Sequence, residues 1–230
     1  MTDSNTRPEN RILAYDEILS KPAGENGEKM VDVRTYDPTI LAEYEQFDMI
    51  PYTGDVIFVR DSIAHKLADA NSNLAHQNLR LRVVYGYRHP KVQILYFSTR
   101  RAILKESYPL ASDDELDALT HNFTAVPKVA GHPTGGAIDC TLTTTKGVPI
   151  DMGTQIDFND ARIQTFSEGL SETQIKNRQI LRDSLILQGF APFNGEWWHF
   201  SYGDREWACF YNKPISLYSA LDFNTTEVAG

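Results

Sequence analysis

Two short stretches of the sequence each place a histidine and a carboxylate in chain whose glycines and aromatic residues do not favour a helix. The stretch G-H-P-T-G-G-A-I-D contains His132 and Asp139, and the stretch G-E-W-W-H contains Glu196 and His199. Two imidazoles and one carboxylate are a common ligand set for a catalytic zinc ion, which keeps its fourth position for water. We therefore expect His132, Asp139 and His199 to bind one metal ion.

Glu196 precedes His199 by three residues, and this spacing favours a role beside the metal over a role as a ligand. On an ideal strand the two side chains would point to opposite faces. Gly195 indicates that the strand begins late, so that Glu196 can turn toward the metal. Zinc lowers the pKa of a bound water molecule, but a nearby base must still accept its proton. We expect Glu196 to be the general base on zinc-bound water.

The chain around these residues predicts the elements that bring them together. Residues 130–136 contain a proline and three glycines and are expected to form a loop. Residues 137–143 alternate between polar and apolar side chains, with Asp139 on the polar face, which is typical of a half-buried strand. Residues 197–202 and 207–211 are aromatic and are separated by Gly-Asp, a turn signal. We expect a C-terminal hairpin that carries the third ligand.

Helices are expected on either side of these strands. Ile63, Leu67 and Leu74 recur at near-helical spacing, and capping boxes predict helices that begin near Ser112 and Ser171. These elements together predict an α+β fold, with an antiparallel sheet covered by helices and a single zinc site at the sheet.

The first part of the chain differs from the rest. Residues 1–30 show little periodicity and are expected to form an N-terminal arm. Residues 31–230 are expected to form a single domain that carries the zinc site. At 230 residues the chain is long enough for one large domain of this kind.

The composition narrows the class of partner. The chain has 31 acidic residues against 22 basic ones, and its formal net charge is −9. It shows no basic stripe of the kind that nucleic-acid-binding proteins use, and no apolar run of the roughly 18 residues that a membrane helix needs. No secretory signal is visible in its first residues, so we expect a cytoplasmic protein that acts on a small molecule. Cys140 and Cys209 are too few for a disulfide scaffold and are expected to be buried; the sequence sets no oligomeric state.

Four motifs occur in one order along the chain: V-Y-G-Y-R at 84–88, A-G-H-P-T-G-G-A-I-D at 130–139, M-G-T-Q-I-D-F at 152–158 and E-W-W-H at 196–199. They resemble motifs of the zinc D-alanyl-D-alanine dipeptidases, the family that includes the dipeptidases of vancomycin resistance. The resemblance implies that residues 31–230 are a zinc peptidase domain that hydrolyses short D,D-dipeptides such as D-Ala-D-Ala. It also implies one zinc ion per subunit, held by His132, Asp139 and His199.

The resemblance implies further roles that the residues alone do not reveal. Arg88 would stabilise the oxyanion of the tetrahedral intermediate, which suits a guanidinium placed near a developing negative charge. Asp157 would bind the free ammonium group of the substrate. Ala130 stands where the family has a serine that helps bind the C-terminal carboxylate of the substrate, and His89 stands where it has a proline. These changes leave the zinc chemistry intact and bear on which dipeptide fits best.

Three alternatives share parts of this pattern. A peptidoglycan D,D-carboxypeptidase or endopeptidase would use the same zinc site and predicts an open groove. A non-catalytic zinc-binding module would not need Glu196 and Arg88. A non-haem iron oxygenase also uses two histidines and a carboxylate, but its carboxylate usually lies two residues after the first histidine, where this chain has Thr134.

Overall fold

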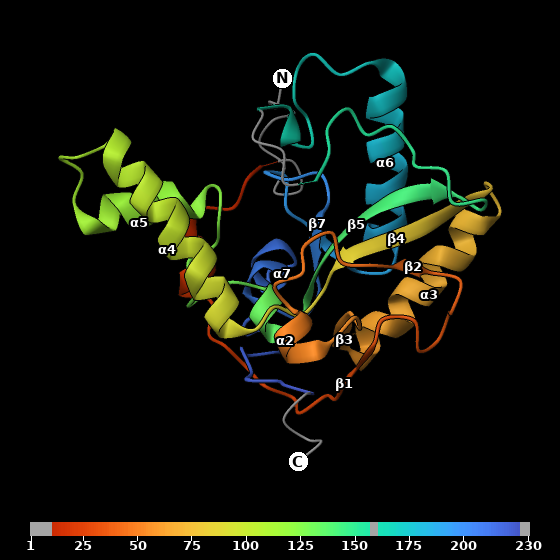
Figure 1. Ribbon diagram of the computed structural model, residues 1–230, viewed down its shortest axis with the longest axis horizontal. Coiled ribbons are helices and arrows are strands. Elements are labelled where there is room, and N and C mark those ends of the chain that lie inside the picture. The colour runs from red at the N-terminus through yellow and green to blue at the C-terminus, as the bar shows by residue number, and fades with distance from the viewer. Residues whose placement is uncertain (1–10, 157–160, 226–230) are drawn as a thin grey trace.

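The computed structural model describes residues 11–156 and 161–225, and within them the protein has a mixed α+β fold (Figure 1). A five-stranded sheet has the order β2–β4–β5–β7–β6, and a second, two-stranded sheet pairs β1 with β3. The strands are β1 (Met30–Asp32), β2 (Leu41–Ala42), β3 (Phe58–Arg60), β4 (Leu79–Tyr85), β5 (Ala137–Thr144), β6 (Ala191–Pro192) and β7 (His199–Ser201). The helices are α1 (Tyr15–Ser20), α2 (Ile50–Thr53), α3 (Asp61–Ala75), α4 (Pro90–Ser107), α5 (Asp113–His121), α6 (Glu172–Leu187) and α7 (Arg205–Phe210), with short 3-10 turns at His132–Thr134 and Ala161–Ile163.

Three of the four strand pairs in the larger sheet are antiparallel, as the sequence predicts, and the fourth is not. β2 runs parallel to β4, with Leu41 beside Arg82. The chain between these two strands passes through β3 and helix α3, and parallel strands need a connection of about this length. The expectation of a wholly antiparallel sheet is therefore wrong at this edge.

β5 lies at the centre of the sheet and is buried on both faces. Asp139 and Thr143, on the face that the alternation marks as polar, are as buried as Ile138 and Leu142 on the other face. The prediction of a half-buried strand is therefore wrong for Asp139 and Thr143, whereas Thr141 between them is partly exposed. The polar residues of the second face then need partners inside the protein.

Helices α3 and α6 pack against each other and against the sheet, through β4 and β6 respectively. The residues that they bury are spaced for one helical face: Ile63, Leu67 and Leu74 on α3, and Leu181 and Leu185 on α6. All five belong to the main hydrophobic core, together with residues of β4 and β5. This confirms the helical periodicity read from the sequence.

Helices α4 and α5 form a hairpin that extends away from the sheet, toward the left in Figure 1. Arg101 of α4 donates hydrogen bonds to Asp113 and Asp117 of α5, each at 2.6 Å. The predicted capping box at Ser112 begins α5. The base of the hairpin packs on a small apolar cluster of its own, formed by Leu13, Ile18, Phe97, Val126 and Val129.

The chain after β7 forms a helix, so the predicted C-terminal hairpin is wrong in its second half. Residues 207–211, expected to be a strand, lie in and just after α7. Asp204 begins this helix because its Oδ1 accepts the backbone N–H of Trp207 at 2.8 Å. Aspartate is a strong helix N-cap, and here that signal outweighs the aromatic composition. β7 pairs instead with β5 and β6.

Three further features concern the start of the described chain, the two cysteines and the length of the helices. α1 lies within the stretch predicted to be an arm and packs on α7. Cys140 is buried and Cys209 is half-buried, and both are free thiols. Among the described residues, no helix is both long enough and apolar enough to cross a lipid bilayer.

Candidate active site

His132 is held in place by the loop that carries it. Gly135 ends the 3-10 turn with a φ of 71°, in the left-handed region that glycine adopts without strain. Arg60 secures the same loop, since its Nε donates to the Thr134 carbonyl at 2.8 Å and its backbone N–H to the Gly135 carbonyl at 3.0 Å. The ring Nδ1 of His132 lies 2.7 Å from the Gly86 carbonyl oxygen. A carbonyl only accepts, so Nδ1 carries the proton and Nε2 keeps its lone pair for a metal.

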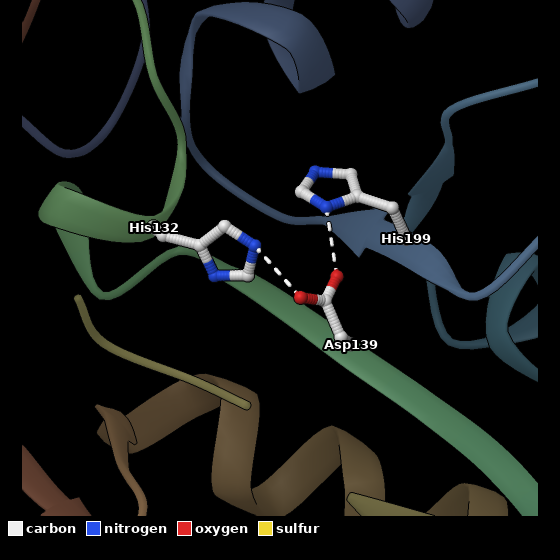
Figure 2. A group of neighbouring side chains, drawn as sticks. All are labelled: His132, Asp139 and His199. Atoms are coloured by element: carbon white, nitrogen blue, oxygen red, sulfur yellow. Dashed lines mark hydrogen bonds and ion pairs between the residues drawn. The ribbon is translucent and has the colours of Figure 1, made fainter. Parts of the chain in front are cut away.

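Asp139 and His199 lie directly opposite each other on the paired strands β5 and β7 (Figure 2). The two carboxylate oxygens of Asp139 face different histidines: Oδ1 lies 3.0 Å from Nδ1 of His199, and Oδ2 lies 3.2 Å from Nε2 of His132. One potential ligand atom from each of the three residues lies within 4.8 Å of the others. The structure therefore brings together the three residues that the sequence predicts as metal ligands.

The electrostatics of this cluster show how closely its members interact. Burial alone would raise the pKa of Asp139, but the two histidines hold it well below its usual range. Burial opposes a charge on His199, yet its hydrogen bond to the Asp139 carboxylate and the negative charge of that carboxylate raise the pKa of His199 to about 9. Burial lowers the pKa of His132. The opposite shifts of Asp139 and His199 reflect the close contact between the two side chains.

A pocket of about 550 Å³ opens over the cluster, and Glu196 lines it together with the three ligand candidates. Glu196 lies in the bend before β7, where its carbonyl accepts the backbone N–H of His199 at 3.3 Å. The strand begins only at His199, as Gly195 predicts, so strand alternation does not force Glu196 to the opposite face. The charge of Glu196 also contributes to the raised pKa of His199, which places the two groups within electrostatic reach.

Arg88 follows the C-terminal end of β4 and lines the same pocket. Its Nη2 lies 3.9 Å from Oδ2 of Asp139, and its Nη1 donates to Gln93 at 3.0 Å. The guanidinium carbon lies 4.4 Å from the ring centre of Tyr85 and 5.0 Å from that of Tyr96, so two aromatic rings hold it. Its buried Nε has no hydrogen-bond partner among the described residues.

The sequence of the chain also matches the model of a known protein family. The family model for D-Ala-D-Ala dipeptidases, Peptidase_M15, matches residues 45–220. The chain belongs to this family. It is thereby a member of a family of metallopeptidases, and the resemblance noted from its four motifs is confirmed.

Individual D-Ala-D-Ala dipeptidases match the chain to different extents. The D-alanyl-D-alanine dipeptidase of Enterococcus faecium is 30% identical over 160 residues, which are 66% of this chain and 77% of that protein. The one of Enterococcus faecalis is 26% identical over 205 residues, which are 84% of this chain and 100% of that protein. The one of Synechocystis sp. is 42% identical over 94 residues, and the match spans only 38% of that protein.

Solved structures of peptidoglycan peptidases overlap the fold partially. A vancomycin-resistance D,D-pentapeptidase VanY variant in complex with Zn(II) gives a TM-score of 0.42 at 17% identity, over 70% of this chain and 83% of that one. The LD-carboxypeptidase LdcB gives a TM-score of 0.45 at 16% identity, over 92% and 85%. Overlaps of this size do not assign a role to any residue of the present chain.

The remaining predicted positions of this family member lie as follows. Ala130 is buried and lines the pocket. His89 has a structural place, since its Nδ1 accepts the backbone N–H of Lys91 at the start of α4 and its Nε2 pairs with Asp222 at 2.7 Å. Asp157, expected to bind the substrate ammonium group, lies outside the described residues.

Sequence reasoning missed two features of the pocket. Tyr96 lies on α4, eight residues after Arg88, and no motif marks it as a neighbour of the guanidinium. Glu206 of α7 lines the pocket, but it lies in the stretch predicted to be a strand. The Asp204 N-cap three residues before Trp207 is the signal that would have placed Glu206 in the first turn of a helix.

Proposed function

We propose that this family member hydrolyses short D,D-dipeptides such as D-Ala-D-Ala, with residues 31–230 as a zinc peptidase domain that holds one zinc ion. The proposal depends above all on one observation. His132, Asp139 and His199 offer three ligand atoms within 4.8 Å of one another at the floor of a pocket that Glu196 also lines.

The donor set suits zinc. Two imidazole nitrogens and one carboxylate oxygen leave a fourth position free in a tetrahedral site. The Gly86 carbonyl fixes the tautomer of His132 so that its Nε2 can coordinate, as outer partners do in metal sites. Nδ1 of His199 and a carboxylate oxygen of Asp139 would supply the other two ligands. A zinc ion held there would polarise the scissile carbonyl and lower the pKa of a water molecule.

Three residues of the chain would carry out the other steps of the reaction. Glu196 accepts the proton of the attacking water and returns it to the leaving amine. Arg88 stabilises the negative charge that develops on the carbonyl oxygen, and the rings of Tyr85 and Tyr96 hold its guanidinium for this purpose. Asp157 binds the free ammonium group of the substrate, as the family resemblance implies.

A second candidate, a D,D-carboxypeptidase on longer peptides, is favoured by the extent of the pocket. Beyond the metal cluster the pocket continues along α4, where Gln93, Tyr96, Thr99 and Ile103 lie at helical spacing on its wall. Gln93 and Ile103 are ten residues apart, which corresponds to roughly 15 Å along a helix axis. An extended dipeptide spans only about 7 Å. The wall is therefore long enough for a substrate of more than two residues.

One substrate panel distinguishes the two candidates. Zinc-loaded protein would be given D-Ala-D-Ala, L-Ala-L-Ala, N-acetyl-D-Ala-D-Ala and a pentapeptide that ends in D-Ala-D-Ala. We expect hydrolysis of D-Ala-D-Ala that a chelator abolishes and added zinc restores. Acetylation should lower kcat/KM at least about tenfold, because it removes a charge-assisted hydrogen bond worth roughly 1.5–3 kcal/mol. Equal or faster cleavage of the acetylated dipeptide and the pentapeptide would instead establish the carboxypeptidase.

A further inference from the structure

One carboxylate in the pocket has no part in the proposed reaction. Glu206 lies in the first turn of α7 and lines the pocket together with His199, Gly131 and Ala130. Its Oε1 is buried without a hydrogen-bond partner, and within residues 11–156 and 161–225 it forms no ion pair with a lysine or arginine. A buried carboxylate without a partner is costly in a folded protein. Its place at a substrate pocket indicates that a ligand supplies the partner.

Contacts of α7 with the loop before His132 fix the position of Glu206. Asp204 caps α7 through its Oδ1, and its Oδ2 lies so close to Gly131 that a Cβ atom at that position would collide with it. The first turn of α7 is thereby held against the loop that carries Ala130 and His132. α7 also packs on α1, which contributes Ile18 to the same pocket. Glu206 is therefore part of a rigid wall.

This wall lacks the hydroxyl group that the family resemblance leads one to expect. Ala130 offers no hydrogen bond to a carboxylate, whereas Glu206 presents a hydrogen-bond acceptor. Burial raises the pKa of Glu206 to about 8, and the charges of Asp204 and Glu196 add to this shift, whereas the charge of His199 opposes it. The charge of His199 therefore does not fully offset the burial of this carboxylate. A buried acidic side chain on this wall favours a cationic group beside it.

We infer that Glu206 is a specificity-determining residue that binds a cationic side chain on the leaving residue of the substrate, such as that of D-lysine or D-ornithine. The inference rests on the proposed function. The substrate ammonium group would donate a charge-assisted hydrogen bond to Oε1 of Glu206. The leaving residue is assigned because Ala130, on the same wall, stands where the family resemblance places the C-terminal part of the substrate. The preferred substrate is then a D,D-dipeptide with a neutral first residue and a basic second residue.

The unmodified zinc-loaded protein provides the first test. Initial rates would be compared on D-Ala-D-Lys, D-Ala-D-norleucine and D-Lys-D-Ala, since norleucine matches the lysine chain without its charge. We expect kcat/KM for D-Ala-D-Lys to exceed that for D-Ala-D-norleucine at least about tenfold, which corresponds to roughly 1.4 kcal/mol. Free D-lysine should also inhibit at lower concentration than free D-norleucine.

Variants then assign the preference to one carboxylate. Glu206→Gln keeps the size of the side chain and removes its charge, so the ratio of the two kcat/KM values should fall to within about twofold of one. Glu106→Gln serves as the matched control, because Glu106 is an exposed acid of α4 that does not line the pocket. The control should leave the ratio unchanged.

The possible outcomes separate this inference from the proposed function. If D-Ala-D-Ala is hydrolysed but lysine and norleucine are treated alike, the inference is overturned and the function stands. A stronger preference for D-Lys-D-Ala would overturn the assignment to the leaving residue. Failure to hydrolyse any D,D-dipeptide would overturn both proposals.

Discussion

The pocket has two walls that the chain builds in different ways. The wall that carries the proposed zinc ligands, which we call the metal wall, lies at the ends of β5 and β7 and in the loop before β5, and its side chains are buried and individually anchored. The hairpin wall is a stripe along α4, completed by the end of α5 and the segment after it, and it includes Leu95, Ile103 and Phe123, which are exposed. Bond-making chemistry needs ligands fixed to within fractions of an ångström, which a buried sheet provides. Side chains on a half-exposed helix can be substituted without disturbing the sheet.

Because the two walls are built differently, we expect substitutions in them to have different effects. Changes on the metal wall should act on metal content and turnover. Changes on the hairpin wall should act on substrate range and on stability, because the hairpin packs on a small apolar cluster separate from the main core. The following predictions test this division, from the largest expected effect to the smallest.

Asp139→Ala should produce the largest loss. The carboxylate contacts both histidines, and without it the site loses one ligand and the charge that balances the cation. We expect zinc content to fall far below one ion per chain and kcat/KM to fall by about 10⁴ or more, because carbonyl polarisation and water activation are lost together. Elemental analysis after gel filtration, with kinetics on D-Ala-D-Ala, measures both. His76→Ala, at an exposed histidine just after α3, is the control and should keep full zinc. Full zinc in the Asp139 variant would show that the ligand set is wrong.

Glu196→Gln should separate chemistry from metal binding on the same wall. The variant keeps the size of the side chain but cannot accept the proton of the attacking water, so kcat should fall roughly 10²- to 10⁴-fold. Zinc content should remain at the level of the unmodified protein. Glu168→Gln, at an exposed acid before α6, is the matched control. A variant that instead loses zinc in proportion to its activity would make Glu196 a ligand.

Arg88→Met should have a somewhat smaller effect. Methionine can occupy the space between Tyr85 and Tyr96 but cannot donate to a developing oxyanion, so we expect kcat to fall roughly 10²- to 10³-fold. KM should change much less, because the lost interaction belongs to the transition state. Arg82→Met, an arginine of β4 paired with Glu45, is the control and should leave kcat unchanged. An equal loss of kcat in both variants would mean that Arg88 serves the fold and not the reaction.

The sequence predicts the metal wall better than the hairpin wall, and the reason is physical. His132, Asp139 and Glu196 lie within short segments whose glycines and alternation fix local geometry, so neighbours in sequence remain neighbours in space. His199 reaches Asp139 through the pairing of β5 with β7, which the sequence does not predict, because residues 197–202 are expected to pair with residues 207–211.

What the sequence does not predict depends on packing between distant segments. The parallel pairing of β2, the burial of both faces of β5 and the helical state of Glu206 are decided by tertiary contacts or by a single cap. The contact of Tyr96 with Arg88 depends on the direction in which α4 leaves the sheet. Local patterns carry no information about that direction.

His121→Asn should have the smallest effect, and it concerns stability rather than turnover. His121 ends α5 on the hairpin wall, and burial lowers its pKa to about 4. A histidine whose folded pKa lies below its unfolded value of about 6.5 stabilises the fold fully above pH 6.5, and this contribution is lost as the pH falls toward 4. Two and a half pH units correspond to about 3 kcal/mol.

The variant should remove this acid sensitivity while keeping the local hydrogen bond. Oδ1 of asparagine can accept the backbone N–H of Val126, which Nδ1 of His121 accepts at 3.2 Å, and asparagine does not titrate. Urea unfolding of the metal-free protein at pH 7 and pH 4.5, followed by circular dichroism, measures the change. The unmodified protein and the exposed-site control His76→Asn should lose about 2–3 kcal/mol more than His121→Asn between these pH values. Equal losses in all three proteins would mean that protonation of the metal wall, and not of the hairpin wall, sets the acid limit of the fold.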